Sequence, residues 1–407
     1  MTRGIYPRKR CVSGIVALFL AVLCHGVVMA KASPVLPDTS GPDISFAQIN
    51  VQRPLDLSLS GGSVGFVWGG PSTGPHVPGS TYYPMSRDLD RSHDPAWWQA
   101  HMRDGLAYQC DAASPAGFYS YAWGAFTAID IANPQVRQYV FNTFLAPAIT
   151  RTNPVIAVDN VSPRNVDGRC GAFRHGHWVT MYSGAKRDPA FARDVVDWIG
   201  WLRAHVHAAG GLLALNAKVD KSDLDRTRQI IAQGDIWLDE AAYTRDCKGR
   251  VAMPMWGVKF ALAQWAAPRM GWVDLEKSCA SPATIDDDEA QWVVGNFLLS
   301  KGAQSYLAVV HDGDPPAGMR YPASLNPPVG RPLGAAYPLG GGVMARRFTH
   351  GLVLVNPSPG AFLSFPVPPG QWRRMDGHPL GDAVHLRPTS ALILLGAADR
   401  SGTPALR

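Results

Sequence analysis

The chain has 407 residues, of which 46% are hydrophobic and 17% charged, so it can bury a large core and form one large domain with a smaller one. Five of its 38 basic residues, and no acidic residue, lie in residues 1–32, so that the remainder carries about +1 of the formal net charge of +6. A nearly neutral protein gives no electrostatic reason to expect nucleic acid or an anionic lipid surface as a partner.

The first 32 residues have the pattern of a secretory signal peptide. Basic residues precede the apolar run VSGIVALFLAVL (12–23), and VMAKAS (28–33) offers a cleavage site after Ala32. The run is too short to span a membrane, so we expect a secreted or periplasmic protein with no stable membrane insertion after cleavage. A lipid anchor at Cys24 is the less favoured alternative, because the bulky Leu23 precedes it.

Residues 33–60 are rich in Pro, Ser and Asp and are expected to form an extended lead-in. Apolar strands then alternate with helical patterns over residues 61–342, which predicts a (β/α)8 TIM barrel. The clear strands are expected at 63–70, 105–111, 155–161, 211–218, 235–241, 271–278 and 305–314, with an eighth at 335–343. An open doubly wound sheet is the alternative, but no G-x-G-x-x-G follows the first strand.

Helix starts are readable in three places. Asn133 before Pro134 and Asp188 before Pro189 predict capped helices, and Gly210 predicts the end of the second one. Asp286 has capping-box spacing, and its acidic cluster is interpreted as a helix start in preference to a calcium site. Residues 343–400 are short strands separated by Pro and Gly, typical of a small antiparallel β domain.

Four cysteines remain after the predicted signal peptide, and four allow three pairings. We favour Cys110 with Cys170 and Cys247 with Cys279, because each pair would join loops that a barrel brings together. Zinc is the competing interpretation, but the chain has no C-x-x-C spacing. We therefore expect disulfides and neither a metal nor a cofactor.

Reactive groups of parallel barrels stand at the C-terminal ends of the strands. Asp159 and Glu240 each follow an apolar strand there, and two carboxyls at one cleft suit glycoside hydrolysis. A carbohydrate substrate is therefore expected, bound by polar and aromatic residues near the same ends: Trp68, Asp111, Tyr121, Trp123, Asn160, Asn216, Lys218, Tyr243 and Asp312. Turn capping by Asp111 or Asp312 and core packing by the aromatic residues are the structural alternatives.

Five segments resemble a known group of proteins when taken in order. They are AYQCD (107–111), AIDIANPQVRQYV (128–140), VIAVDNV (155–161), GDIWLDEAAYT (234–244) and RRFTHGLVLVNPSPG (346–360). The chain resembles predicted bacterial glycoside hydrolases with a TIM barrel and a small C-terminal β domain, most of all the glycosyl hydrolase-like family 15 group. The resemblance implies that Asp159 and Glu240 are the catalytic pair, with Glu240 as general acid/base and Asp239 as its structural neighbour.

The strand at 211–218 lies between the strands of the two acids, which favours a wide carboxyl separation and hence inversion. Lys218 on that strand is expected to keep Asp159 ionised. Two other functions stay open: a non-catalytic carbohydrate-binding protein on the same barrel, and another carbohydrate-active enzyme such as a lyase or deacetylase.

Overall fold

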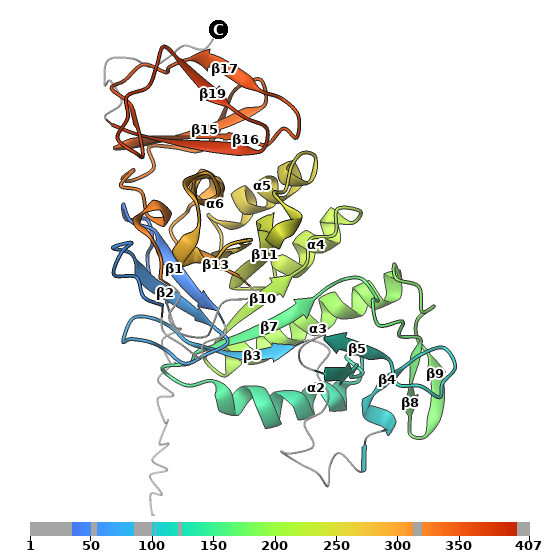
Figure 1. Ribbon diagram of the computed structural model, residues 1–407. Coiled ribbons are helices and arrows are strands. Elements are labelled where there is room, and N and C mark those ends of the chain that lie inside the picture. The colour runs from blue at the N-terminus through green and yellow to red at the C-terminus, as the bar shows by residue number, and fades with distance from the viewer. Residues whose placement is uncertain are drawn as a thin grey trace, which may run out of the picture. The chain divides into compact units, whose positions relative to one another are not determined.

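The computed structural model describes residues 35–49, 55–84, 100–101, 103–120, 124–311 and 320–396. Its largest sheet has eight strands, all paired in parallel, in the order β2-β1-β13-β12-β11-β10-β7-β3 (Figure 1). The strands are β1 (Ser45–Ile49), β2 (Ser63–Trp68), β3 (Ser80–Pro84), β7 (Val155–Val161), β10 (Leu212–Ala217), β11 (Ile236–Arg245), β12 (Gly271–Lys277) and β13 (Ser305–Val310).

Chain order and spatial order agree around this sheet, because β1 lies between β13 and β2. The seam between β2 and β3 is bridged by the hydrogen bond from the Val67 amide to the Pro78 carbonyl, 3.1 Å, and by the Ser80 hydroxyl, which donates to the Val67 carbonyl. The sheet is therefore a nearly closed TIM barrel, which confirms the predicted fold class.

Helices cover the outside of the barrel after β3, β7, β10, β11 and β12. They are α2 (Pro134–Val140), which continues into the π-helical η1 (Phe141–Leu145) and the 3-10 turn η2 (Ala146–Ala148), then α3 (Pro189–Ala208), α4 (Leu224–Ile231), α5 (Met255–Ala266) and α6 (Asp287–Ser300). Asn133, Asp188 and Asp286 cap α2, α3 and α6 with their side chains, as predicted. The β2–β3 connection (69–79) contains no helix.

Two of the predicted barrel strands are wrong. Only Ala107–Tyr108 of the expected strand 105–111 is a strand, β4, and it pairs antiparallel with β8 outside the barrel. The expected eighth strand, 335–343, contains β14 (Tyr337–Gly340) of the C-terminal sheet. Their places in the barrel are taken by β1, which lies in the expected lead-in, and by β3, whose sequence STYYP has no apolar run.

Long connections after β3 and β7 carry small antiparallel sheets. β4 pairs with β8 (Gly171–Arg174), which pairs with β9 (His177–Thr180), and β5 (Gly117–Ser120) pairs with β6 (Gly124–Thr127). The Cys110–Cys170 disulfide joins the two connections, with Cα atoms 4.9 Å apart. Cys247 and Cys279 form the second disulfide, so both predicted pairings are confirmed.

The chain ends in an antiparallel β domain, drawn in orange to red in Figure 1. One sheet has the order β14-β15-β16-β20-β18 and a second pairs β17 with β19. The remaining strands are β15 (Val343–Phe348), β16 (Gly351–Asn356), β17 (Leu363–Pro366), β18 (Arg373–Arg374), β19 (Ala383–Leu386) and β20 (Ser390–Leu395); 3-10 turns lie at η3 (Asp246–Lys248), η4 (Pro282–Thr284) and η5 (Ala323–Leu325).

Alternate residues of β16 and β20 face two different cores. Leu352, Leu354 and Leu394 pack within the β domain, whereas Val353 and Ile393 belong to the apolar cluster of the barrel helices. The contact with α6 is close at Gly295, where an added Cβ would lie 2.8 Å from the Ala391 Cβ. A glycine is therefore needed at this point of α6.

No helix among the described residues is long and apolar enough to cross a membrane. Residues 1–32 lie outside the described residues, and the signal peptide therefore stays a prediction.

Candidate active site

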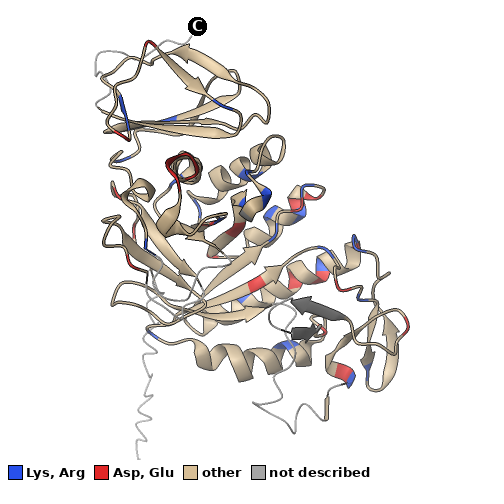
Figure 2. Cartoon of the chain, viewed as in Figure 1, with Lys and Arg blue, Asp and Glu red and all other residues tan. Residues whose placement is uncertain are grey.

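Strand alternation directs four polar side chains to the C-terminal mouth of the barrel. In β7, Val155 and Ala157 face the barrel interior, and the same alternation continues to Asp159. The same alternation holds on the next three strands, where each polar residue comes two positions after an apolar residue that faces the interior. These polar residues are Asn216 after Ala214 in β10, Glu240 after Leu238 in β11, and Lys277 after Leu275 in β12. Four consecutive barrel strands thus contribute one polar group each. Charged residues on the eight barrel strands are confined to β7, β11 and β12 (Figure 2).

Asn216 joins the two candidate catalytic acids. Its Nδ2 donates to Asp159 Oδ1 at 2.6 Å and to Glu240 Oε2 at 2.9 Å. Since both oxygens lie on one nitrogen, they cannot be more than about 5.5 Å apart, which is at the separation of retaining glycosidases and below that of inverting ones. The wide separation expected from the strand order is therefore wrong, because the side chain on the intervening strand draws the carboxyls together.

Asp159 is held by donors on both of its oxygens. The Tyr82 hydroxyl donates to Oδ2 at 2.7 Å, and Asn160 donates its amide N–H to Oδ1 at 2.8 Å and its Nδ2 to Oδ2 at 3.1 Å. These bonds favour the carboxylate, but burial and the neighbouring charge of Glu240 outweigh them and raise the pKa of Asp159 above its ordinary value. Asp159 thus retains a proton to a higher pH than a solvent-exposed aspartate does.

Glu240 lies in the opposite electrostatic setting. Burial disfavours its charge, but the Lys277 ammonium 2.9 Å from Oε1, the Asn216 amide and the more distant Lys218 together lower the pKa of Glu240 below its ordinary value. The side chains of Glu240 and Lys277 are 30% and 23% exposed, so this ion pair lies at the mouth, within reach of solvent. The pKa values of the two acids are therefore shifted in opposite directions within one site.

Each of the two acids is followed by a non-glycine residue in the left-handed region. Asn160 has φ of 60° and Ala241 has φ of 52°. The strand register shifts next to both positions, between Leu215 and Ala217 of the β10–β7 pair and between Glu240 and Arg245 of the β11–β12 pair. Strained residues of this kind cost of order 1 kcal/mol or more and concentrate at functional sites.

Other expected binding residues lie elsewhere. Tyr243 is fully buried behind the barrel wall, beneath α6, so it has no surface to offer a sugar and this prediction is wrong. Trp68 is 3% exposed and packs in the barrel interior. Asp111 is exposed but accepts bonds from the Ala113 and Ser114 amides and the Ser114 hydroxyl, which is the turn role weighed against binding.

Tyr121, Trp123 and Asp312 lie outside the described residues. Lys218 is exposed at the end of β10, and its charge lowers the pKa of Glu240, whereas the sequence led us to expect an effect on Asp159. The disulfide between Cys247 and Cys279 joins the segments that follow β11 and β12.

Tyr82 and Lys277 were missed in the sequence. Tyr82 lies on β3, a strand that the apolar pattern did not show. Lys277 could have been found, because in GWVDLEK it shares the alternation of the apolar Val273 and Leu275, whereas Asp274 and Glu276 point to the helices.

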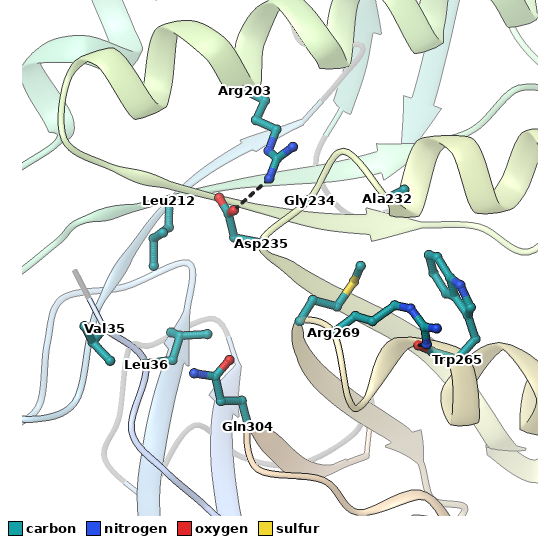
Figure 3. A pocket seen from close by; sticks show the side chains of 11 residues that line it. Val35, Leu36, Arg203, Leu212, Ala232, Gly234, Asp235, Trp265, Arg269 and Gln304 are labelled. Carbon is teal, nitrogen blue, oxygen red and sulfur yellow. Dashed lines mark hydrogen bonds and ion pairs between the residues drawn. The ribbon is translucent and has the colours of Figure 1, made fainter. Parts of the chain in front are cut away.

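Within the described residues, no group of three or more His, Cys, Asp or Glu side chains could hold a metal ion. A cavity of about 420 Å³ opens at the opposite end of the barrel, next to Leu212, Asp235, Met270 and Gln304, which lie at or just before the starts of β10 to β13 (Figure 3). It is not part of the candidate active site.

The chain is similar in structure to several solved proteins, all at low sequence identity. An Anoxybacillus alpha-amylase is 11% identical with a TM-score of 0.41 over 80% of this chain and 76% of the amylase. Bacillus licheniformis trehalose-6-phosphate hydrolase is 9% identical with a TM-score of 0.43 over 79% of this chain and 83% of the hydrolase. A Malbranchea cinnamomea alpha-amylase is 12% identical with a TM-score of 0.39 over 79% of this chain and 73% of the amylase. No protein-family model and no curated protein matches the sequence, so the resemblance to the family 15 group stays a prediction.

Proposed function

We propose that the chain is an exported glycoside hydrolase that cleaves a poly- or oligosaccharide with Asp159 and Glu240 as its two reacting carboxyls. One observation supports this most strongly. Two acids with oppositely shifted pKa values are held on the Asn216 amide at the mouth of a TIM barrel. One protonated and one ionised carboxyl at this spacing meet the requirements of glycoside hydrolysis.

The short carboxyl separation supports a retaining mechanism, in which one acid attacks the sugar directly. The Lys277 pair keeps Glu240 ionised, which suits the nucleophile, and the raised pKa of Asp159 suits the proton donor. This division is the reverse of the one expected from the sequence. The Tyr82 hydroxyl next to Asp159 Oδ2 can accept as well as donate, so it accommodates the protonated carboxyl.

In the proposed reaction, Asp159 gives its proton to the glycosidic oxygen while Glu240 forms a bond to the anomeric carbon, and the bond from that carbon to the leaving oxygen breaks. Asp159, now ionised, then removes a proton from a water molecule. The water oxygen displaces Glu240 from the anomeric carbon and releases a sugar of unchanged anomeric configuration.

Turnover by the mature chain is tested first. The wild type is incubated with a panel of glycans and new reducing ends are measured. Asp159→Asn and Glu240→Gln should each lose about a thousandfold or more of the activity, since each removes a reacting group. Asp111→Asn is the matched control, because the hydrogen bonds of Asp111 to residues that the structure describes lie within its own turn, and it should retain activity. Full activity in both acid variants would refute the assignment.

The roles are separated with a substrate that needs no proton donor. A dinitrophenyl glycoside of the sugar that is cleaved should still react with Asp159→Asn and accumulate as a glycosyl-enzyme, whereas Glu240→Gln should be inactive on it. The opposite pattern would restore the roles expected from the sequence. Glycan binding without turnover by the wild type would indicate a carbohydrate-binding protein.

A further inference from the structure

β11 leaves the regular sheet ladder directly after Glu240. Glu240 pairs with Leu275, but the next paired residue is Arg245, opposite Lys277. Residues 241–244, here called the β11 bulge, therefore face the single residue Glu276 of the neighbouring strand. A bulge of this kind bends a strand and re-aims side chains, and its backbone groups need partners other than the ladder.

Buried side chains behind the barrel supply part of those partners. Lys259 of α5 donates from Nζ to the Ala241 carbonyl at 3.0 Å. The Tyr243 amide donates to both oxygens of Glu276, at 3.2 and 3.1 Å. Trp292 Nε1 of α6 donates to the Tyr243 carbonyl at 3.1 Å, which also accepts from a backbone amide. The bulge is thus held from behind by α5, β12 and α6.

Lys259 also holds the residue before Glu240. Its Nζ lies 2.7 Å from Asp239 Oδ1, and both side chains are almost completely buried. One ammonium group therefore contacts the residues on either side of Glu240, the Asp239 carboxylate and the carbonyl of the left-handed Ala241. Glu276, which binds the bulge, directly precedes Lys277, the ion-pair partner of Glu240.

This arrangement is poorly suited to stabilising the fold. Three acids, Asp239, Asp274 and Glu276, are buried together with Lys259. Taking each ion out of water costs several kcal/mol, and a buried pair often contributes less to stability than apolar residues of similar size. Lys259 binds the Asp239 carboxylate and the Ala241 carbonyl, and Glu276 accepts from the Tyr243 amide. All three contacts go to residues of β11 next to Glu240, which indicates a role in its geometry.

We propose that Lys259 and Glu276 are positioning residues that fix the direction of Glu240 through the β11 bulge. The proposal rests on the proposed function in taking Glu240 as a reacting group. Without the Lys259 ammonium, the left-handed conformation of Ala241 is no longer held, and Glu240 moves away from Asn216 and Lys277. Such a displacement lowers the rate of the chemical step and leaves substrate binding largely in place.

Lys259→Met in the full mature chain tests the proposal, and Lys301→Met is the control. Lys301 is also a buried lysine, but its Nζ donates to the Gly41 and Asp43 carbonyls, which precede β1. For Lys259→Met we expect kcat to fall by about 100-fold, the effect of displacing a reacting group by about 1 Å, with KM changed by less than about threefold. Lys301→Met should keep the wild-type kcat. Equal losses in both variants would overturn the proposal.

A crystal structure of Lys259→Met separates this proposal from the proposed function. Loss of the Glu240 contacts with Asn216 and Lys277 is expected even if no substrate is ever found, and their retention at 2.9 Å would overturn the positioning role. Should Lys259→Met not fold, Trp292→Phe removes a single bond to the bulge and keeps an aromatic ring in place. It should lower kcat in the same direction by about tenfold, and an unchanged kcat and Glu240 geometry would again refute the proposal.

Discussion

Replacing Asn216 with leucine should disable the site while keeping the volume of the side chain. Its Nδ2 makes the two bonds that join Asp159 and Glu240, at 2.6 and 2.9 Å. A hydrogen bond to a charged group contributes about 1.5 to 3 kcal/mol, and water can replace part of this at the partly exposed mouth. If each of the two bonds contributes the lower value of this range, their loss removes about 3 kcal/mol of stabilisation, which corresponds to a loss of about 150-fold in kcat/KM.

The measurement is kcat/KM on whichever glycan the wild type cleaves, together with the free energy of unfolding. Asn356→Leu is the matched control, because Asn356 is an equally buried amide that joins the Ala361 and Arg387 carbonyls in the β domain. It should lower stability without lowering kcat/KM of the folded protein. A kcat/KM of Asn216→Leu within threefold of the wild type would show that the amide does not organise the acids.

Two further predictions concern the ion pair and the contact between the domains. Lys277→Met should move the acid limb of the pH profile of kcat/KM to higher pH. The reason is that Lys277 lowers the pKa of Glu240, which must be ionised to attack the sugar. A shift of the alkaline limb alone would instead make Glu240 the proton donor. Gly295→Ala should destabilise the protein in thermal unfolding by up to about 2 kcal/mol, since overpacking costs about 1 to 3 kcal/mol and the better helix propensity of alanine offsets about 1 kcal/mol of that cost. Adding Ala391→Gly should restore the stability, because the new Cβ would lie 2.8 Å from that of Ala391, and failure to do so would contradict the packing explanation.

The barrel was predictable from the sequence where its strands are buried on both faces. VIAVDNV, GLLALNAK and SYLAVV are nearly continuous apolar runs, and each forms a barrel strand. β1 and β3 carry no such run, since SFAQI and STYYP mix polar and aromatic residues and are recognised only by their pairing with β13, β2 and β7. Pairing between distant segments leaves no mark in local periodicity.

The two acids were found because each ends an apolar strand, but their surroundings were not. Alternation alone directs Asp239 to the helices and Glu240 to the mouth, and Asp239 forms its ion pair with Lys259 of α5. Tyr243 escaped this reasoning, because the bulge interrupts the alternation after Glu240. The Asn216 bridge depends on side-chain reach across three strands, which the spacing of residues along the chain does not report.

The position of α6 has a consequence for the evolution and engineering of this protein. One side of the helix is covered by β16 and β20, while Trp292 on another side reaches the strand that carries Glu240. The C-terminal sheet thus supports α6 from one side, and α6 in turn contacts β11, the strand that carries Glu240. A chain shortened to end before residue 343 would keep every side chain at the mouth of the barrel. We nevertheless expect it to lose the proposed activity, because α6 would no longer be packed against β16 and β20. The C-terminal domain therefore cannot be exchanged freely for another.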